Sequence, residues 1–162
     1  MIINFNQLPL IRDLHKNSRI VFGGGVYDLL HSGHTQGLTF RKSLGDILVC
    51  GLVSDERAST RKRIPVRNEQ DRLLVLNQFR DIDYTFIMPL PISDISPTLQ
   101  AIKALRPDIY VEYIDNKYRW SNEDHTYLNS LGTKLIFDTQ PKMNSTTAII
   151  ATIKQNYYSS NQ

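Results

Sequence analysis

The chain has 162 residues, of which 41% are hydrophobic and 22% are charged, and its formal net charge is +3. These values predict one globular domain with a single core, and they exclude a disordered chain and a highly charged tail protein. No run approaches about 20 consecutive apolar residues, so we expect no segment that spans a membrane.

The single cysteine, Cys50, lies in the apolar run ILVCGLV and is predicted to be a small buried residue. A lone cysteine cannot form an internal disulfide. That usage fits a reducing compartment, and we expect the chain to be cytoplasmic.

Apolar runs alternate with helical patterns along the chain. The predicted strands cover residues 19–23, 46–54, 83–88, 108–114 and 133–138. The predicted helices cover residues 33–45, 68–82, 98–106, 121–132 and 144–158. This alternation predicts an α/β fold in one domain: a Rossmann-like, doubly wound sheet of five parallel strands with helices on both faces.

The rest of the chain is predicted to extend or connect this domain. Residues 1–18 form an N-terminal extension of one or two amphipathic turns, residues 19–156 form the domain, and residues 157–162 form a tail. Residues 55–67 are predicted to be a basic loop, with cations at Arg57, Arg61, Lys62, Arg63 and Arg67. Such a cluster is typical of a solvated loop, fits a phosphate site, and indicates nucleic acid more weakly.

The segment GGGVYDLLHSGH, residues 23–34, follows the first predicted strand. In doubly wound sheets ligands bind beyond the carboxyl ends of the strands, where the strand order reverses. The glycines allow a ligand to approach the backbone, and His31 and His34 lie on one face at a helix start, whose N–H groups attract anions. This predicts a phosphate cradle. Zinc ligation by the two histidines is an alternative, although no cysteine or third histidine is near in sequence.

The same segment resembles the signature G-x-F/Y-D-x-x-H-x-G-H of the nucleotidyltransferase superfamily that includes cytidylyltransferases and adenylyltransferases. Further segments resemble that family in the same order along the chain: LGDILVCGLVSDE, IPVRNEQDRLLVL, ALRPDIYV and STTAII. The resemblance spans about residues 20–154. It is nearest to the heptose-1-phosphate adenylyltransferases and slightly weaker to the glycerol-3-phosphate cytidylyltransferases.

One stretch departs from the heptose branch. Where that branch carries Lys-Gly-Gly-Asp-Tyr, this chain has Glu112, Tyr113, Ile114, Asp115 and Asn116. In the family this run lies near the acceptor and base pockets. The resemblance therefore implies the transfer chemistry but not the acceptor.

The resemblance implies a reaction in which a phosphate oxygen of an acceptor attacks the α-phosphorus of ATP or CTP and releases pyrophosphate. His31 and His34 would donate hydrogen bonds to the phosphates, Lys42 would reach the acceptor phosphate or the α-phosphate, and Arg72 would hold the triphosphate. For Lys42 and Arg72 the alternative is an ordinary solvated side chain. Mg²⁺ is the implied cofactor, held mainly by substrate phosphates rather than by protein ligands.

The resemblance also implies further contacts. Asp28 either bonds backbone in the glycine turn or faces the acceptor or a metal-bound water, and Ser145 and Thr146 bind phosphates, cap the last helix, or do both. The residues implied to line the nucleotide are Gly23, Gly24, Gly25, Val26, Tyr27 and Gly33. Those implied for the acceptor or for a closing loop are Arg61, Lys62, Arg63 and Asp115.

Two other classes of function stay open at this level. One is a nucleotide-binding regulatory module that keeps the fold and has lost turnover; the other is a nucleic-acid binder that uses the basic loop. No nucleic-acid motif is present, so we expect neither nucleic acid nor a membrane as partner. The resemblance implies a homodimer that binds a nucleoside triphosphate and a small phosphorylated acceptor.

Overall fold

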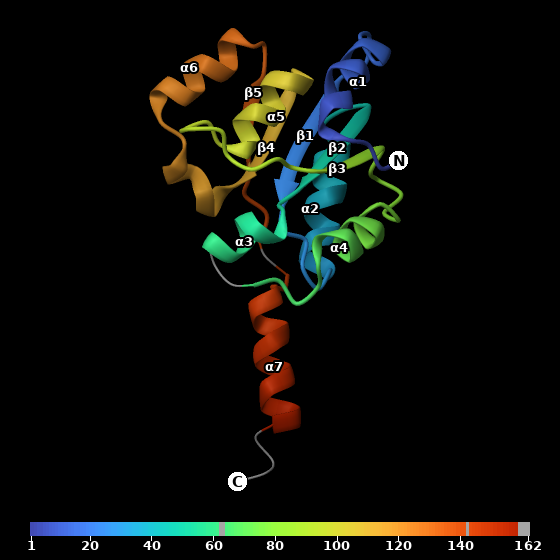
Figure 1. The fold of residues 1–162 in the computed structure, drawn as a ribbon, viewed down its shortest axis with the longest axis vertical. Coiled ribbons are helices and arrows are strands. Elements are labelled where there is room, and N and C mark those ends of the chain that lie inside the picture. Colours follow the sequence, from blue (N-terminus) through green and yellow to red (C-terminus); the bar gives the residue numbers. More distant parts are fainter. Residues whose placement is uncertain (62–63, 142, 159–162) are drawn as a thin grey trace.

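The computed structural model describes residues 1–61, 64–141 and 143–158. Its centre is a sheet of five parallel strands in the spatial order β3-β2-β1-β4-β5 (Figure 1). The strands are β1 (Ile20–Gly25), β2 (Ile47–Leu52), β3 (Tyr84–Ile87), β4 (Ile109–Tyr113) and β5 (Lys134–Asp138). The strand order reverses between β1 and β4, so the predicted doubly wound topology is confirmed.

Helices α2 (Ser32–Ser43) and α4 (Glu69–Leu76) cover one face of the sheet. They contribute Leu38, Leu73 and Leu76 to a buried cluster with strand residues such as Val21 and Leu48. The strands are apolar on both sides because helices bury both faces.

Helices α1 (Leu8–Leu14), α5 (Pro97–Leu105) and α6 (Asn122–Ser130) cover the opposite face. Their apolar side chains pack on Phe22 and Phe86 of the central strands. The helix residues in this second cluster are Leu8, Ile11, Ala101, Ile102, Leu105 and Leu128. The helices therefore lie on both faces, as predicted.

The N-terminal segment packs against the domain and forms backbone hydrogen bonds with it. Ile3 donates its N–H to the carbonyl of Thr85 in β3 at 2.9 Å, and Thr85 donates to the carbonyl of Met1 at 2.9 Å. A 3-10 helix, η1 (Phe5–Gln7), leads into α1, which packs beside α5. The segment thus extends the sheet at its β3 edge.

The predicted basic loop is wrong in its first half. Residues Asp55–Arg61 form helix α3, because Ser54 accepts the N–H of Arg57 at 3.3 Å and Asp55 and Glu56 supply an acidic first turn. A 3-10 helix, η2 (Ile114–Arg119), also follows β4 where no helix was predicted. Helix α4 ends at Leu76, six residues before the predicted end at 82.

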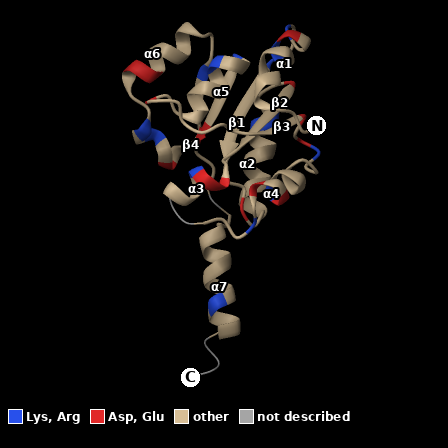
Figure 2. Cartoon of the chain, viewed as in Figure 1, with Lys and Arg blue, Asp and Glu red and all other residues tan. Residues whose placement is uncertain are grey.

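Helix α7 (Thr146–Tyr158) leaves the body beyond the carboxyl ends of the strands, and most of its surface is exposed (Figure 1). Lysines and arginines are scattered over many elements in the view of Figure 2 and do not gather on one face. In the described part of the chain no helix is both long enough and apolar enough to cross a membrane.

Candidate active site

The turn after β1 has a strained backbone. Tyr27 and Leu29 adopt positive φ angles of 52° and 47°, in the left-handed region that few residues other than glycine occupy. Each such residue costs about 1–3 kcal/mol and persists only where its surroundings fix the conformation. Between them Asp28 is buried and accepts the N–H groups of Val66 and Arg67 at 3.0 and 3.3 Å. Of the two roles predicted for Asp28, its carboxylate shows backbone bonding, but to the segment before α4.

Arg72 fixes the same turn from α4. Its guanidinium is fully buried and donates to the carbonyls of Val26, Val53 (3.0 Å) and Arg67 (3.0 Å), and to the carboxylate of Asp55 at 2.7 Å. Each guanidinium nitrogen is thus engaged with protein oxygen. Arg72 is therefore no surface arginine, and its contacts make it a clamp that joins three loops, while its contact with a triphosphate stays a prediction.

Two helix starts meet at this turn. Helix α2 begins after His31, and a β-carbon on Gly33 would lie 2.8 Å from the carbonyl oxygen of Asn144, just before α7. Ser145 caps α7 by accepting the N–H of Ala148 at 3.1 Å, and Thr146 donates its hydroxyl to the carbonyl of Asp28 at 2.7 Å. Capping by Ser145 is therefore present. The unpaired N–H groups of a helix start carry partial positive charge, so the pair of starts favours an anion between them.

The two histidines lie together at the start of α2. Their ring centroids are 3.9 Å apart, and the ring of Tyr27 lies 5.5 Å from that of His34. Burial, the neighbouring imidazole and the charge of Arg41 lower the pKa of His34 to about 4, and burial lowers the pKa of His31. Both rings are neutral at pH 7, so each presents one N–H donor and one nitrogen acceptor.

Buried polar atoms without a hydrogen-bond partner gather at this place. In residues 1–61, 64–141 and 143–158 the buried side-chain atoms without a partner belong to four residues: the Tyr27 hydroxyl, Nδ1 of His31 and of His34, and the three guanidinium nitrogens of Arg41. Buried polar groups in folded proteins are nearly always paired, so each exception calls for an explanation, such as strain, a bound water or ion, or a catalytic role. These four residues surround the carboxyl end of β1, at the point where the strand order reverses.

Arg41 was not predicted as a site residue. Leu38, Arg41 and Leu44 are spaced three apart on α2, so the arginine lies on the inward face of the helix, and that spacing was the available signal. Its fully buried side chain runs past Gly23, where a β-carbon would lie 2.5 Å from Nε. The absent side chain of Gly23 therefore makes room for Arg41, and not for a ligand as predicted. Gly24 and Gly25 likewise face the side chains of Met88 and Tyr27.

The residues that replace the family's glycine run lie at the end of β4 and the start of η2. The ring of Tyr113 lies under the guanidinium of Arg41, 4.8 Å from Cζ to the ring centroid. Glu112 points into its own segment, where it accepts from the Tyr110 hydroxyl at 3.0 Å, the Tyr113 N–H at 2.8 Å and the Asn116 amide at 2.9 Å. Asp115 is exposed in the first turn of η2.

Lys42 does not join the histidines. Its ammonium donates to the carboxylate of Asp83 at 2.7 Å and to the carbonyl of Asp46 at 2.6 Å. Both residues directly precede strands, so this ion pair lies at the amino ends of the strands, the edge opposite the site. In this structure Lys42 is thus engaged with protein groups, and the predicted contact with a phosphate stays a prediction. Arg63 and Lys62 lie outside the described residues, as does the side chain of Arg61.

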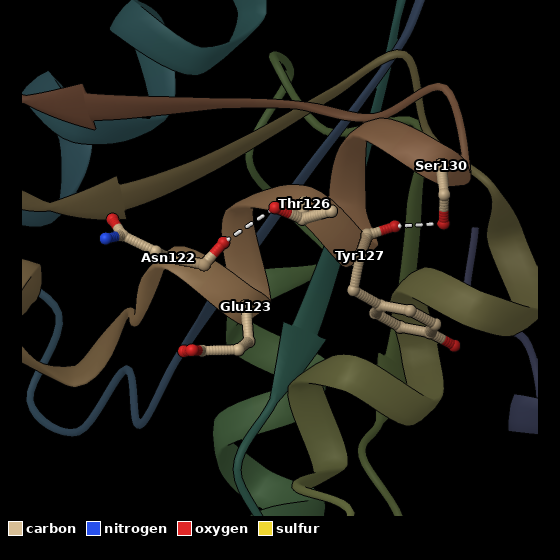
Figure 3. Close-up of a pocket in the computed structure, with 5 residues that line it drawn as sticks. All are labelled: Asn122, Glu123, Thr126, Tyr127 and Ser130. Carbon is tan, nitrogen blue, oxygen red and sulfur yellow. Dashed lines mark hydrogen bonds between the residues drawn. The ribbon is translucent and has the colours of Figure 1, made fainter.

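The remaining candidate parts of a site are a surface pocket and any grouping of possible metal ligands. A pocket lined by Asn122, Glu123, Thr126, Tyr127 and Ser130 has its lining residues on α6 alone (Figure 3). Two of its side chains bond to their own helix, Thr126 to the carbonyl of Asn122 and Ser130 to that of Tyr127. Where the structure describes the chain, no three histidine, cysteine or acidic residues are grouped to hold a metal ion, so zinc ligation by the two histidines lacks further ligands.

Comparison with known proteins gives one consistent result. The family model described as "Cytidylyltransferase-like" matches residues 22–160. "Bifunctional protein HldE" of Helicobacter pylori is 34% identical over 91% of this chain in strain J99 and 35% identical over 88% in strain HPAG1. The chain spans about 30% of the length of these two relatives.

Solved structures share the fold. The lipopolysaccharide core biosynthesis protein from Thermoplasma volcanium GSS1 has a TM-score of 0.65 and 26% identity, over 76% of this chain and 98% of that one. Pantoate-beta-alanine ligase from Francisella tularensis, solved with β,γ-ATP and β-alanine, has a TM-score of 0.55 and 17% identity over 95% of this chain and 77% of that one, and it supports the fold alone. With the family model matched over almost the entire domain, the chain belongs to the cytidylyltransferase-like family of nucleotidyltransferases.

Proposed function

We propose that this chain transfers a nucleoside monophosphate from ATP or CTP to a phosphorylated sugar or polyol, with release of pyrophosphate. The observation that carries the proposal is the gathering of His31, His34, Tyr27 and Arg41, with unpaired buried polar atoms, between two helix starts at the reversal of strand order. Family membership supports the reaction class. The likeness to a lipopolysaccharide core biosynthesis protein supports a sugar acceptor.

In this proposal the histidines bind the triphosphate where charge builds up. Attack of an acceptor oxygen on the α-phosphorus places negative charge on the bridging oxygen to the leaving pyrophosphate. Neutral imidazoles donate N–H bonds to that oxygen, and preorganised donors of this kind are worth about 10²–10³ in rate. No protein nucleophile is needed, because positioning and charge neutralisation supply the catalysis.

The start of α7 is the proposed site of the β- and γ-phosphates. Ser145 and Thr146 already bond to backbone groups there, so their contribution is to hold the helix start in place. The backbone N–H groups of the first turn then face the phosphates. Gly33 allows the two helix starts to approach, since any side chain at that position would collide with Asn144.

Mg²⁺ is proposed to enter the site with the nucleotide. Ions of this kind are usually held by substrate phosphates and by few protein ligands. When bound, Mg²⁺ would neutralise phosphate charge. The task left to the chain is to orient the phosphates through His31, His34 and the two helix starts.

The acceptor is proposed to be other than the usual heptose-1-phosphate. Tyr113 fills space at the end of β4 beside Gly37, with its hydroxyl 2.8 Å from where a β-carbon of Gly37 would lie. Two glycines in the same run would leave that space open. A smaller or differently shaped phosphorylated sugar or polyol therefore fits better than a heptose phosphate.

A panel of acceptors with ATP and with CTP, followed by pyrophosphate release, tests this function. We expect release only when triphosphate and acceptor are both present. Heptose-1-phosphate with ATP as the best pair by a wide margin in kcat/KM would refute the acceptor proposal. Binding of triphosphate without release for any acceptor would instead favour the regulatory module.

A further inference from the structure

Arg41 is a cation without a counter-ion in hydrogen-bonding contact. It is fully buried, and none of its three guanidinium nitrogens makes a hydrogen bond of good geometry among the described residues, although the Tyr113 hydroxyl is close enough to favour its charge. The guanidinium instead lies over the face of the Tyr113 ring. Burial opposes the charge, but the pKa of Arg41 stays above its ordinary value because of the neighbouring tyrosines Tyr27 and Tyr113, so the group stays charged.

A buried and unpaired charge is one of the most destabilising features that a fold can contain. Three other buried or half-buried cations have protein partners: Arg72 has four protein oxygens, Lys42 has Asp83 and a carbonyl, and Arg12 has Asp108 and three carbonyls. Arg41 thus differs from arginines that serve the fold. An arginine in this state inside a binding site is typical of a group that meets its anion on the ligand.

Arg41 lies further along α2 than the contact with the start of α7. Its guanidinium is beside Gly23 of β1, Gly37 of α2 and Tyr113 at the end of β4, whereas Asn144, just before α7, lies beside Gly33, four residues earlier than Gly37. Asp138, at the end of β5, lies nearby. A β-carbon on Gly37 would lie 3.0 Å from Nη1 of Arg41 and 3.5 Å from Oδ2 of Asp138. The two groups make no hydrogen bond, and Oδ1 of Asp138 accepts from the N–H of Gln140 at 3.0 Å.

The Arg41 side chain occupies space that is open because Gly23 and Gly37 carry no side chains. A β-carbon at Gly23 would lie 2.5 Å from Nε, and one at Gly37 would lie 3.0 Å from Nη1. No hydrogen bond of good geometry from the described part of the chain holds the guanidinium, so its nitrogens remain available to an anion that reaches the carboxyl ends of β4 and β5.

We propose that Arg41 is a specificity-determining residue that binds the phosphate group of the acceptor, with Tyr113 as the stacking surface that positions its guanidinium. The proposal rests on the proposed function. Arginine suits the role because its planar fork bonds two phosphate oxygens at once. The substrate class follows: the acceptor carries a phosphate that reaches the floor of the site between α2 and β4.

Inorganic phosphate is the probe for an activity-free test. The melting temperature is measured over a phosphate series, at ionic strength matched with chloride, with and without a saturating non-hydrolysable triphosphate. The variants are Arg41→Met, which keeps the volume and removes the charge, and Arg41→Lys, which keeps the charge. Arg80→Met is the matched control, because the Arg80 side chain is 97% exposed.

We expect phosphate to raise the melting temperature of the wild type and of Arg80→Met, to have no specific effect on Arg41→Met, and to raise that of Arg41→Lys in part. In chloride alone, Arg41→Met should melt at or above the wild-type temperature, because an unpaired buried charge has been removed. A melting temperature that falls in chloride, with an unchanged phosphate effect, would show a purely structural arginine and overturn the proposal.

Steady-state kinetics supplies the second readout. Arg41→Met should raise KM for the phosphorylated acceptor by about tenfold or more, as for a lost charge-assisted hydrogen bond, and leave KM for the triphosphate within about twofold. A rise in the triphosphate KM alone would contradict the assignment. If neither ATP nor CTP analogues shift the melting temperature, the proposed function fails, while the phosphate series still decides whether Arg41 binds an anion.

Discussion

The imidazole rings of His31 and His34 lie 3.9 Å apart between centroids, inclined by 33°, at the first turn of α2. Two imidazolium charges at that separation would repel strongly in a partly buried place, which adds to burial in lowering the pKa of His34 to about 4. The pair is therefore neutral at pH 7, and the free energy of unfolding of the chain depends on pH through His34.

The sign of that dependence follows from the direction of the shift. The pKa of His34 is about 4 in the folded chain and near 6.5 in the unfolded chain, so the unfolded state binds more protons between these values. The stability that His34 contributes is complete above about pH 6.5 and is lost as the pH falls toward 4. The free energy of unfolding, measured in urea at pH 7.5 and at pH 5, should fall less for His34→Gln than for the wild type, by on the order of 1–2 kcal/mol. Equal losses in the two proteins would contradict the buried neutral imidazole.

Arg72→Met should destabilise the fold by about 3 kcal/mol, because Asp55 and the carbonyls of Val26, Val53 and Arg67 lose their shared donor. Arg72→Lys should not restore the loss, since an ammonium cannot reproduce the planar fork. Arg67→Met is the control: the pair of Arg67 with Asp71 is half-exposed and is worth about 0.5 kcal/mol. Denaturant titration measures all three, and a loss below about 1 kcal/mol for Arg72→Met would show that Arg72 is no clamp.

Gly33→Ala should weaken triphosphate binding while the fold stays intact. Alanine favours the helix, but its β-carbon would lie 2.8 Å from the Asn144 carbonyl and force the starts of α2 and α7 apart. Ser32→Ala, at the exposed neighbouring position, is the control. Thermal shift with ATP and CTP measures both, and an unchanged shift for Gly33→Ala would mean that the approach of the two helix starts is not needed for binding.

We expect the chain to be a homodimer. Helix α7 leaves the body with apolar side chains exposed: Ile153 at 43%, Tyr157 at 73% and Tyr158 at 75%. A second copy is one way to cover them. Light scattering at micromolar concentration should give twice the chain mass of 18.7 kDa, and a monomer mass would refute the expectation.

The order of elements could be predicted from sequence, because strand runs and helix stops are local patterns, and the strand-to-helix histidines are a local pattern that gave the candidate site. Lys42, Arg72 and Gly23 have contacts within the chain that could not be predicted, for a common reason. Each depends on which distant group the side chain meets: Asp83 for Lys42, three loop carbonyls for Arg72, and Arg41 for Gly23. Local spacing does not determine such long-range partners.

Arg41 is a further residue whose partners could not be predicted from sequence. Its place on the inward face of α2 was visible from its spacing to Leu38 and Leu44, but that spacing alone does not reveal whether a buried arginine has a partner. Only the three-dimensional arrangement shows that its guanidinium nitrogens have none within the described chain. Helix α3 was not predicted because its basic residues are equally typical of a loop, although the cap Ser54 and the acidic first turn indicate a helix start.

The central claim is that the neutral histidine pair supports nucleotidyl transfer. Its most direct test is steady-state pyrophosphate release from ATP and CTP with a phosphorylated acceptor, for the wild type and for His34→Ala, with the transferred product identified by mass spectrometry and folding checked by circular dichroism. We predict a nucleotidylated product with the wild type and a turnover lower by on the order of 10²-fold in a folded His34→Ala. A folded His34→Ala that releases pyrophosphate at a rate near that of the wild type would contradict the account.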